Sequence, residues 1–249
     1  MMSGMAAITM AGFGMRFRQA GYTRPKNRIE AAGHPLFDWS MQALAAFWTS
    51  GWKLSFALRA ADGAAPFIRD RCERLGIHVG EIVELSAPTD GQATTALLLA
   101  ERADHEQPFA VFNIDTYVRP GAMDPNVIPE GCQGWIPCFP GPGDAWSFAR
   151  VDAENRVVEI REKERISDHA TVGLYWFATA GLYRDVYTRY FEQDRHLDAG
   201  ERYIAPMYAE MIRSGADVRI ARLQLSDVGM LGTPEQLRQF NATPPADPF

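Results

Sequence analysis

A short stretch near the start of the chain combines a flexible turn with positive charge. It reads MAGFGMRFRQAGYTRPK, in which Gly12 and Gly14 are followed by Arg16 and then by Lys26. A glycine turn directly after a strand exposes backbone N–H groups that can hold phosphate, and neighbouring cations stabilise its negative charge. The pattern suits a triphosphate whose pyrophosphate must leave. The alternative is a glycine turn whose basic side chains simply face solvent.

A dinucleotide-binding loop is a second candidate for this stretch. It would need a third glycine at position 17, where this chain has Phe17. The sequence therefore favours a phosphate-binding loop of a different kind.

Alternating strands and helices must position the loop. The apolar patterns predict strands at 6–12, 53–60, 78–85 and 108–118 and helices at 35–50, 66–76 and 93–103. Such alternation is typical of a parallel sheet with crossover helices. In open α/β sheets the ligand binds at the carboxyl ends of the strands, where the glycine loop and Asp115 both fall.

The second half of the chain changes character. Residues 121–143 contain five prolines and five glycines, which predicts loops that cover a site. After them we expect a hairpin of strands 146–152 and 156–162, a strand at 171–179, helices at 180–193 and 201–215, and a strand at 217–225. The sequence thus predicts one domain over residues 1–241 and a flexible tail at 242–249.

Composition limits the function classes. The chain has 249 residues, 47% of them hydrophobic and 22% charged, with a formal net charge of −6. An acidic protein of this kind is a poor candidate for binding nucleic acid or a membrane surface, because those partners call for a basic face. The N-terminus lacks the basic region of a signal peptide, and the three cysteines show no metal-binding spacing. We therefore expect a cytoplasmic protein with reduced thiols; the sequence leaves its oligomeric state open.

Six motifs in order resemble the sugar-phosphate nucleotidyltransferases, also called nucleotide-sugar pyrophosphorylases. The first is the Gly-x-Gly-x-Arg loop with its later Pro-Lys. The others are PTDGQATTALLLA (88–100), FAVFNIDTYV (109–118), VVEIREKERISDHATVGLYWF (157–177), ERYIAPMYAEMIRSG (201–215) and LGTPEQLRQF (231–240). Together they cover roughly residues 6 to 240, and six motifs in one order are far more specific than any one of them.

The resemblance implies a fold and an activity. The fold is a nucleotide-diphospho-sugar transferase (Rossmann-like) α/β fold, three layers with a mixed, mainly parallel sheet. The activity is transfer of NMP from an NTP to a phosphorylated acceptor, with release of pyrophosphate, in the synthesis of surface-polysaccharide precursors. The implied acceptor is a sugar 1-phosphate, and the implied cofactor is Mg²⁺.

The resemblance also implies roles for residues at the matching positions. Arg16 would stabilise the departing pyrophosphate, and Lys26 would bridge the two reacting phosphates. Nucleotide-binding residues would be Ala11, Gly12, Gly14, Thr89, Gly91 and Thr94; acceptor-binding residues would be Glu162, Lys163 and Gly173; the metal ligand would be Asp115. Taken alone, Asp115 could cap the next turn, and Glu162 and Lys163 could belong to a solvated charged face.

Two departures from the family pattern affect these assignments. Members often carry a second metal-binding Asp where this chain has Met230, so Asp227, three residues earlier, is the substitute candidate. Asn27 and Arg28 follow Lys26, where the family more often has Pro-Leu or Ala-Leu.

Other functions stay open at this stage, as does the base of the nucleotide. One alternative is a cytidylyltransferase for a non-sugar acceptor, either phosphocholine or a phosphorylated amino-acid amide. Another is a catalytically inactive nucleotide-binding regulatory module. A glycosyltransferase is disfavoured because it usually needs an Asp-x-Asp motif, and Asp115 is followed by Thr116 and Tyr117.

Overall fold

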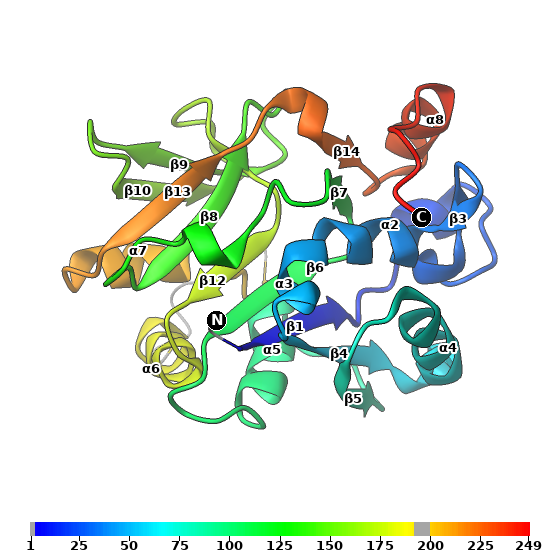
Figure 1. The fold of residues 1–249 in the computed structure, drawn as a ribbon, viewed down its shortest axis with the longest axis horizontal. Helices are drawn as coiled ribbons and strands as arrows, with labels where there is room; N and C mark the ends of the chain where they lie inside the picture. Colours follow the sequence, from blue (N-terminus) through cyan, green and yellow to red (C-terminus); the bar gives the residue numbers. More distant parts are fainter. Residues whose placement is uncertain (1–2, 192–199) are drawn as a thin grey trace.

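A ten-stranded mixed sheet runs through the computed structural model, which describes residues 3–191 and 200–249 (Figure 1). The strands lie in the order β10 (Val157–Glu162), β9 (Ser147–Val151), β11 (Ala170–Thr171), β8 (Gly134–Phe139), β12 (Leu174–Phe177), β6 (Phe109–Asn113), β1 (Met5–Met10), β4 (Lys53–Arg59) and β5 (Val79–Leu85), with β13 (Val218–Arg222) paired to β8. The half from β6 to β5 is parallel, whereas β12 runs antiparallel to β6 and β8.

The sequence of β1 explains why the sheet is covered on both faces. Ala6 and Ile8 contact one hydrophobic core, whereas Met5 and Ala7 contact another. Successive side chains of a strand point to opposite faces, so an unbroken apolar run such as MAAITM must be buried on both sides. The expected three-layer α/β fold is confirmed.

Helices form the two outer layers. On one face lie α2 (Leu36–Ala43), α3 (Ala45–Thr49) and α4 (Ala65–Leu75); on the other lie α5 (Gln92–Ala100), α6 (Ala180–Phe191) and α7 (Met207–Arg213). A third apolar cluster surrounds Trp39 and includes Leu237 and Phe240 of α8 (Pro234–Ala242). The short α1 (Met15–Gln19) follows the glycine loop. None of the helices in the described ranges is long and apolar enough to cross a membrane.

Smaller elements complete the chain. They are the strand pairs β2 (Glu30–Ala31) with β3 (His34–Pro35) and β7 (Thr116–Val118) with β14 (Val228–Met230), and the 3₁₀ turns η1 (Lys26–Arg28), η2 (Ala60–Asp62), η3 (Pro125–Val127) and η4 (Leu225–Asp227). The end of the predicted tail makes contacts: the Phe249 ring stacks on His34 with centroids 3.9 Å apart.

Several predicted elements differ from the structure. The predicted helix 35–50 is broken at Leu44 into α2 and α3, and only 207–213 of the predicted helix 201–215 is helical. The predicted strand 108–118 is interrupted after Asn113, which leaves Asp115 in a turn between β6 and β7. The last two residues of the predicted helix 180–193 lie outside the described residues.

The largest error concerns residues 121–143, which we expected to be loops. They contain β8, a fully buried strand that pairs with β11, β12 and β13. Pro137 argues against a central strand, because proline has no N–H to donate. Pairing on both sides overrides that local preference, and the carbonyl of Pro137 accepts a hydrogen bond from Val172 at 3.2 Å.

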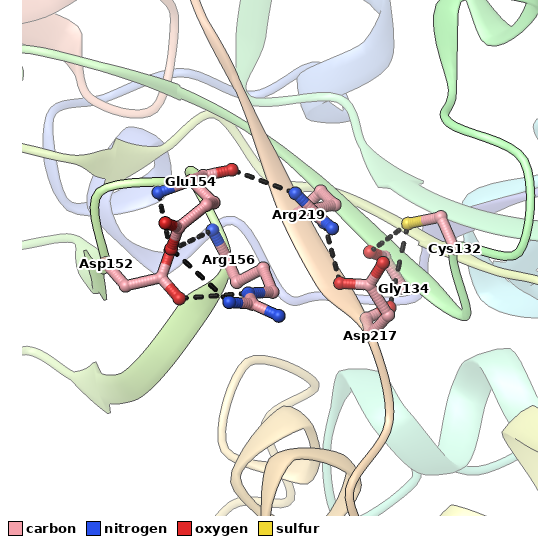
Figure 2. Close-up of polar contacts among 7 residues, drawn as sticks. All are labelled: Cys132, Gly134, Asp152, Glu154, Arg156, Asp217 and Arg219. Atoms are coloured by element: carbon pink, nitrogen blue, oxygen red, sulfur yellow. Dashed lines mark hydrogen bonds and ion pairs between the residues drawn. The ribbon is translucent and has the colours of Figure 1, made fainter.

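A polar network joins the turn between β9 and β10 to β13 (Figure 2). The hairpin of β9 and β10, which the sequence predicted, forms the edge of the sheet opposite β5 (Figure 1). Asp152 accepts hydrogen bonds from Arg156 within the turn, and Arg219 of β13 donates to the carbonyl of Glu154 at 2.8 Å. In the same network the thiol of Cys132 donates to the carbonyl of Gly134, and burial raises its pKa to about 11. The thiol is therefore neutral and structural, like that of Cys72.

Candidate active site

Three adjoining cavities meet at one carboxylate, that of Asp115. The Lys26 cavity (about 400 Å³) lies under the glycine loop, the Gly91 cavity (about 540 Å³) lies between that loop and the start of α5, and the Glu162 cavity (about 280 Å³) lies beside β10 and β12. All three follow the carboxyl ends of β1 and β6, as expected for an open α/β sheet. Asp115 lines each of them.

Asp115 is held in place from its backbone. Its N–H donates to the Asn113 side-chain oxygen at 3.2 Å, and its carbonyl accepts from the Leu231 N–H at 2.8 Å. Its carboxylate accepts a hydrogen bond from the Lys26 ammonium at 2.5 Å. The Lys26 side chain is 14% exposed and that of Asp115 is 47% exposed, so the lysine is anchored while the carboxylate faces the cavities. An anionic ligand can replace Asp115 as the partner of Lys26, and a cationic ligand can replace Lys26 as the partner of Asp115.

The glycine loop leaves its backbone donors open. Gly14 has φ +61°, a left-handed conformation that favours glycine, and α1 begins directly after it. The N–H groups of residues 12–16 donate no hydrogen bond to any described residue. Arg16 lines both the Lys26 and Glu162 cavities, is exposed, and has no ion pair with the described residues. The loop and Arg16 therefore present unused donors toward Asp115.

The Gly91 cavity depends on a close backbone approach. A Cβ at Gly91 would lie 2.4 Å from the Arg202 nitrogen, and the Arg202 N–H donates to the Asp90 carbonyl at 2.8 Å. The structure brings five of the six residues expected to bind nucleotide to this one cavity: Ala11, Gly12, Gly14, Thr89 and Gly91.

Thr94 does not line the Gly91 cavity. Its hydroxyl bonds to Tyr187 at 2.8 Å and to Asp90, whereas Thr95 and Gln92 line the cavity instead. Residues three apart in a helix share a face, so a helix beginning at Gln92 directs Gln92 and Thr95 together. The spacing of Gln92 and Thr95 in the sequence could have indicated this. The structure therefore places Thr95 at the cavity in the position that the sequence analysis gave to Thr94.

The Glu162 cavity carries a chain of hydroxyl groups. Ser147 donates to the Glu162 carboxylate, and the Tyr175 hydroxyl lies 2.9 Å from that of Thr171. Burial raises the pKa of Tyr175 above its usual range, so the phenol stays protonated. Lys163 donates to the Tyr203 hydroxyl at 2.7 Å, and its ammonium lies 4.2 Å from the centre of the Tyr203 ring.

Gly173 also lines this cavity for a steric reason. It has φ +86°, and a Cβ there would meet the Asn113 amide at 2.5 Å. Asn113, Tyr203 and Gln236 line the cavity too, although nothing in the sequence motifs singled them out.

Asp227 is the predicted site residue that the fold separates from the rest. In the antiparallel pair of β7 and β14, Met230 is opposite Thr116 and Val228 is opposite Val118, so Asp227 lies at the far end of β7 from Asp115. Its carboxylate accepts hydrogen bonds from Arg119 at 2.8 Å and from the Gln224 N–H at 3.0 Å. These donors lower its pKa. The prediction of Asp227 as a partner of Asp115 is therefore wrong: it caps η4.

Comparison with known proteins agrees with this geometry. No protein-family model and no curated protein sequence match the chain. A solved structure described as a nucleoside-diphosphate-sugar pyrophosphorylase from Vibrio cholerae RC9 matches at 33% identity over 95% of this chain and 99% of the other, with a TM-score of 0.85. The chain belongs to the nucleoside-diphosphate-sugar pyrophosphorylase family.

More distant structures share the fold. An inositol-1-phosphate CTP transferase from T. maritima aligns over 98% of both chains at 16% identity, with a TM-score of 0.74. A UDP-glucose pyrophosphorylase from Acinetobacter baumanii aligns over 96% of this chain and 92% of the other at 17% identity, with a TM-score of 0.71. The predicted family and enzyme class, a nucleotidyltransferase, are confirmed.

Proposed function

We propose that the enzyme transfers a nucleoside monophosphate from an NTP to a sugar 1-phosphate and releases pyrophosphate, in the cytoplasm, for the synthesis of surface-polysaccharide precursors. The observation that carries this proposal is the meeting of three cavities at Asp115, with Arg16 and Lys26 beside it. The Gly91 cavity suits the nucleoside, the Glu162 cavity suits the acceptor, and the Lys26 cavity suits the phosphates between them.

In the proposed reaction, an oxygen of the acceptor phosphate attacks the α-phosphorus of the NTP. A new P–O bond forms as the bond between the α-phosphorus and the bridging oxygen breaks, and pyrophosphate leaves with that electron pair. A phosphate is already a nucleophile, so the site needs no general base; it must bring two polyanions together. Lys26 and Arg16 supply the positive charge that this approach requires.

The residues present fit a Mg²⁺ ion carried by the nucleotide. Mg²⁺ prefers oxygen ligands and is often held by one or two carboxylates together with substrate phosphates. Asp115 supplies such a carboxylate, and the described residues contain no group of three or more potential metal-ligating side chains. Bound there, the ion would neutralise phosphate charge, while Lys26 exchanges Asp115 for phosphate oxygens.

The Glu162 cavity favours a sugar over choline as the acceptor. Glu162, Ser147 and Thr171 offer polar groups that suit the hydroxyls of a sugar ring. Choline is a quaternary ammonium, which proteins bind in aromatic cages. Trp146, Tyr175 and Tyr203 line this cavity, but the Lys163 ammonium lies over the Tyr203 ring, and its positive charge repels a second cation.

The test is pyrophosphate release with Mg²⁺, for each of the five common NTPs crossed with sugar 1-phosphates, phosphocholine and phosphorylated amino-acid amides. We expect one strongly preferred pair containing a sugar 1-phosphate. A preferred amide or phosphocholine would replace the acceptor assignment, and NTP binding without turnover on any acceptor would support the regulatory alternative.

Lys26→Ala tests the catalytic assignment. We expect kcat to fall by at least about 10²-fold, the usual cost of removing one charge-stabilising donor from an active site. Lys53→Ala is the matched control, because Lys53 is exposed at the opposite, amino end of β4. Wild-type turnover by Lys26→Ala would contradict the assignment.

A further inference from the structure

Two large apolar side chains are exposed, one in the glycine loop and one at the start of α1. Phe13 is 50% exposed and Met15 is 54% exposed, and both line the Gly91 cavity. Leaving an aromatic ring half in water forgoes hydrophobic stabilisation, and exposed apolar groups that cluster at a cavity mark binding sites. A ligand that covers Phe13 would account for its position.

The Phe13 ring is supported from one side. The Arg59 guanidinium lies 4.7 Å from the ring centre, and Arg59 in turn donates to the Asp62 carboxylate at 2.6 and 3.1 Å. The Arg59 and Asp62 side chains are 12% and 16% exposed, so this support is largely fixed. Half of the Phe13 surface is still exposed, which leaves apolar area for a ligand to cover.

The surroundings of Phe13 identify the kind of ligand. Phe13 lines the Gly91 cavity together with Pro88, Thr89 and Gly91, whereas it does not line the Glu162 cavity. A triphosphate is too polar to cover an aromatic ring, but every nucleobase has a flat π face, and stacking on aromatic side chains tolerates any base. Gly12, beside Phe13, has nothing within 4 Å of a Cβ position, which leaves room for a flat ring.

We propose that Phe13, supported by Arg59, stacks on the nucleobase of the bound NTP. This inference rests on the proposed function and adds a nucleotide-positioning residue to it. Stacking contributes affinity for any base, so selection among bases falls to the Thr89–Gln92 side of the cavity.

The experiment compares NTP binding with binding of inorganic tripolyphosphate, which has no base. Binding is measured by calorimetry with Mg²⁺ for the wild type, Phe13→Ala and Phe13→Trp, using whichever of the five common NTPs the wild type binds most tightly. We expect Phe13→Ala to weaken NTP binding about tenfold, within the range for loss of one base–aromatic stack. Tripolyphosphate binding should stay unchanged, and Phe13→Trp should restore NTP binding.

Phe249→Ala is the matched control: Phe249 is 43% exposed and lies outside the three cavities. It should bind NTP like the wild type. Unchanged NTP binding by Phe13→Ala would overturn the inference, and so would equal weakening of NTP and tripolyphosphate, which would mean a distorted loop. Failure of the proposed function would show differently, as a wild type that binds NTP without releasing pyrophosphate.

Discussion

Lys26 and Asp115 illustrate how single residues prepare the site before substrate arrives. Each compensates the charge of the other across 2.5 Å, so neither charge is left without a partner in a partly dry cavity. In the proposed reaction, a nucleotide phosphate would replace Asp115 as the partner of Lys26, and the Asp115 carboxylate would then be available to hold a metal ion. Such an exchange would keep both charges paired, so substrate binding would leave neither of them without a counter-charge.

The three cysteines give a pH prediction at the same scale. Burial raises the pKa of Cys72 to about 12, that of Cys132 to about 11, and that of Cys138 further still. In the unfolded chain a thiol ionises near pH 8.5. Below that pH both states are protonated and the stabilising contribution is complete; above it only the unfolded state loses protons, so stability falls as pH rises toward 11.

We therefore expect the free energy of unfolding to drop between pH 8.5 and 10, with a slope per thiol that rises toward about 1.4 kcal/mol per pH unit. Urea titrations with a reductant present measure it. Cys72→Ala should reduce the dependence of the unfolding free energy on pH by the contribution of one thiol. This change in slope is expected whatever the substitution does to the absolute stability. An identical slope in the variant would show that Cys72 ionises in the folded state.

At the scale of elements, the segment 200–206 connects the two halves of the site. Glu201 lines the Gly91 cavity, Tyr203 lines the Glu162 cavity, and the Arg202 backbone between them bonds to Asp90 and Ala93. Gly91 makes this contact possible, since any side chain there would collide with Arg202.

Gly91→Ala should therefore displace the whole segment. We expect kcat/KM to fall about 10²-fold for both NTP and acceptor, the scale of loss from misplacing groups by about 1 Å. Steady-state kinetics with each substrate varied gives both values. Gly121→Ala is the control, because Gly121 also has positive φ, at +82°, but nothing within 4 Å. A loss confined to NTP would mean that the segment does not connect the cavities.

A buried ion pair joins two of the outer helices. Asp38 of α2 is fully buried and accepts hydrogen bonds from Arg71 of α4, whose side chain is 21% exposed. Removing either partner has a different consequence. Without Arg71 the buried Asp38 carboxylate has no counter-charge, whereas without Asp38 the Arg71 guanidinium can still be solvated.

Arg71→Met should accordingly cost about 3–5 kcal/mol of stability, the usual penalty for a stranded buried charge. Asp38→Asn should cost less, about 1–3 kcal/mol, because a hydrogen bond is lost but no charge is stranded. Chemical denaturation of both variants at neutral pH tests the order. Equal losses would contradict the asymmetry.

Sequence reasoning succeeded where the signal is local. The apolar run of β1, the glycine loop and the turn after β6 are all adjacent in the chain, and they place Lys26, Arg16 and Asp115 in adjoining cavities. It failed where distant pairing decides: β8 is a strand because β12 and β13 flank it, and Asp227 is separated from Asp115 by the register of β14 on β7. Tyr203 was missed because only the fold brings it to Lys163.

At the scale of the whole molecule, the two halves of the sheet form different cavities of the site. The parallel half, through β1 and the start of α5, forms the Gly91 cavity; the antiparallel half, through β10 and β12, forms the Glu162 cavity. They meet at the end of β6, where Asp115 lies between them. Of the two carboxylates that the sequence predicted as metal ligands, only Asp115 lies at this junction, so we expect the remaining ligands of the proposed metal to come from the substrate and from water.

This arrangement predicts that Mg²⁺ affinity depends on the nucleotide. Without NTP, the ion must compete with the Lys26 ammonium for Asp115, and neither Met230 nor the distant Asp227 supplies a second carboxylate. We expect only millimolar binding of Mg²⁺ alone, on the order of the weak sites with few charged ligands. With NTP, the phosphates complete the coordination and take Lys26 from Asp115, so the two ligands should bind with positive coupling. Calorimetric Mg²⁺ titrations with and without NTP measure the difference, and Asp115→Asn should reduce the coupling, whereas Asp227→Asn should not. Micromolar binding of Mg²⁺ to the nucleotide-free enzyme would contradict the single-carboxylate site.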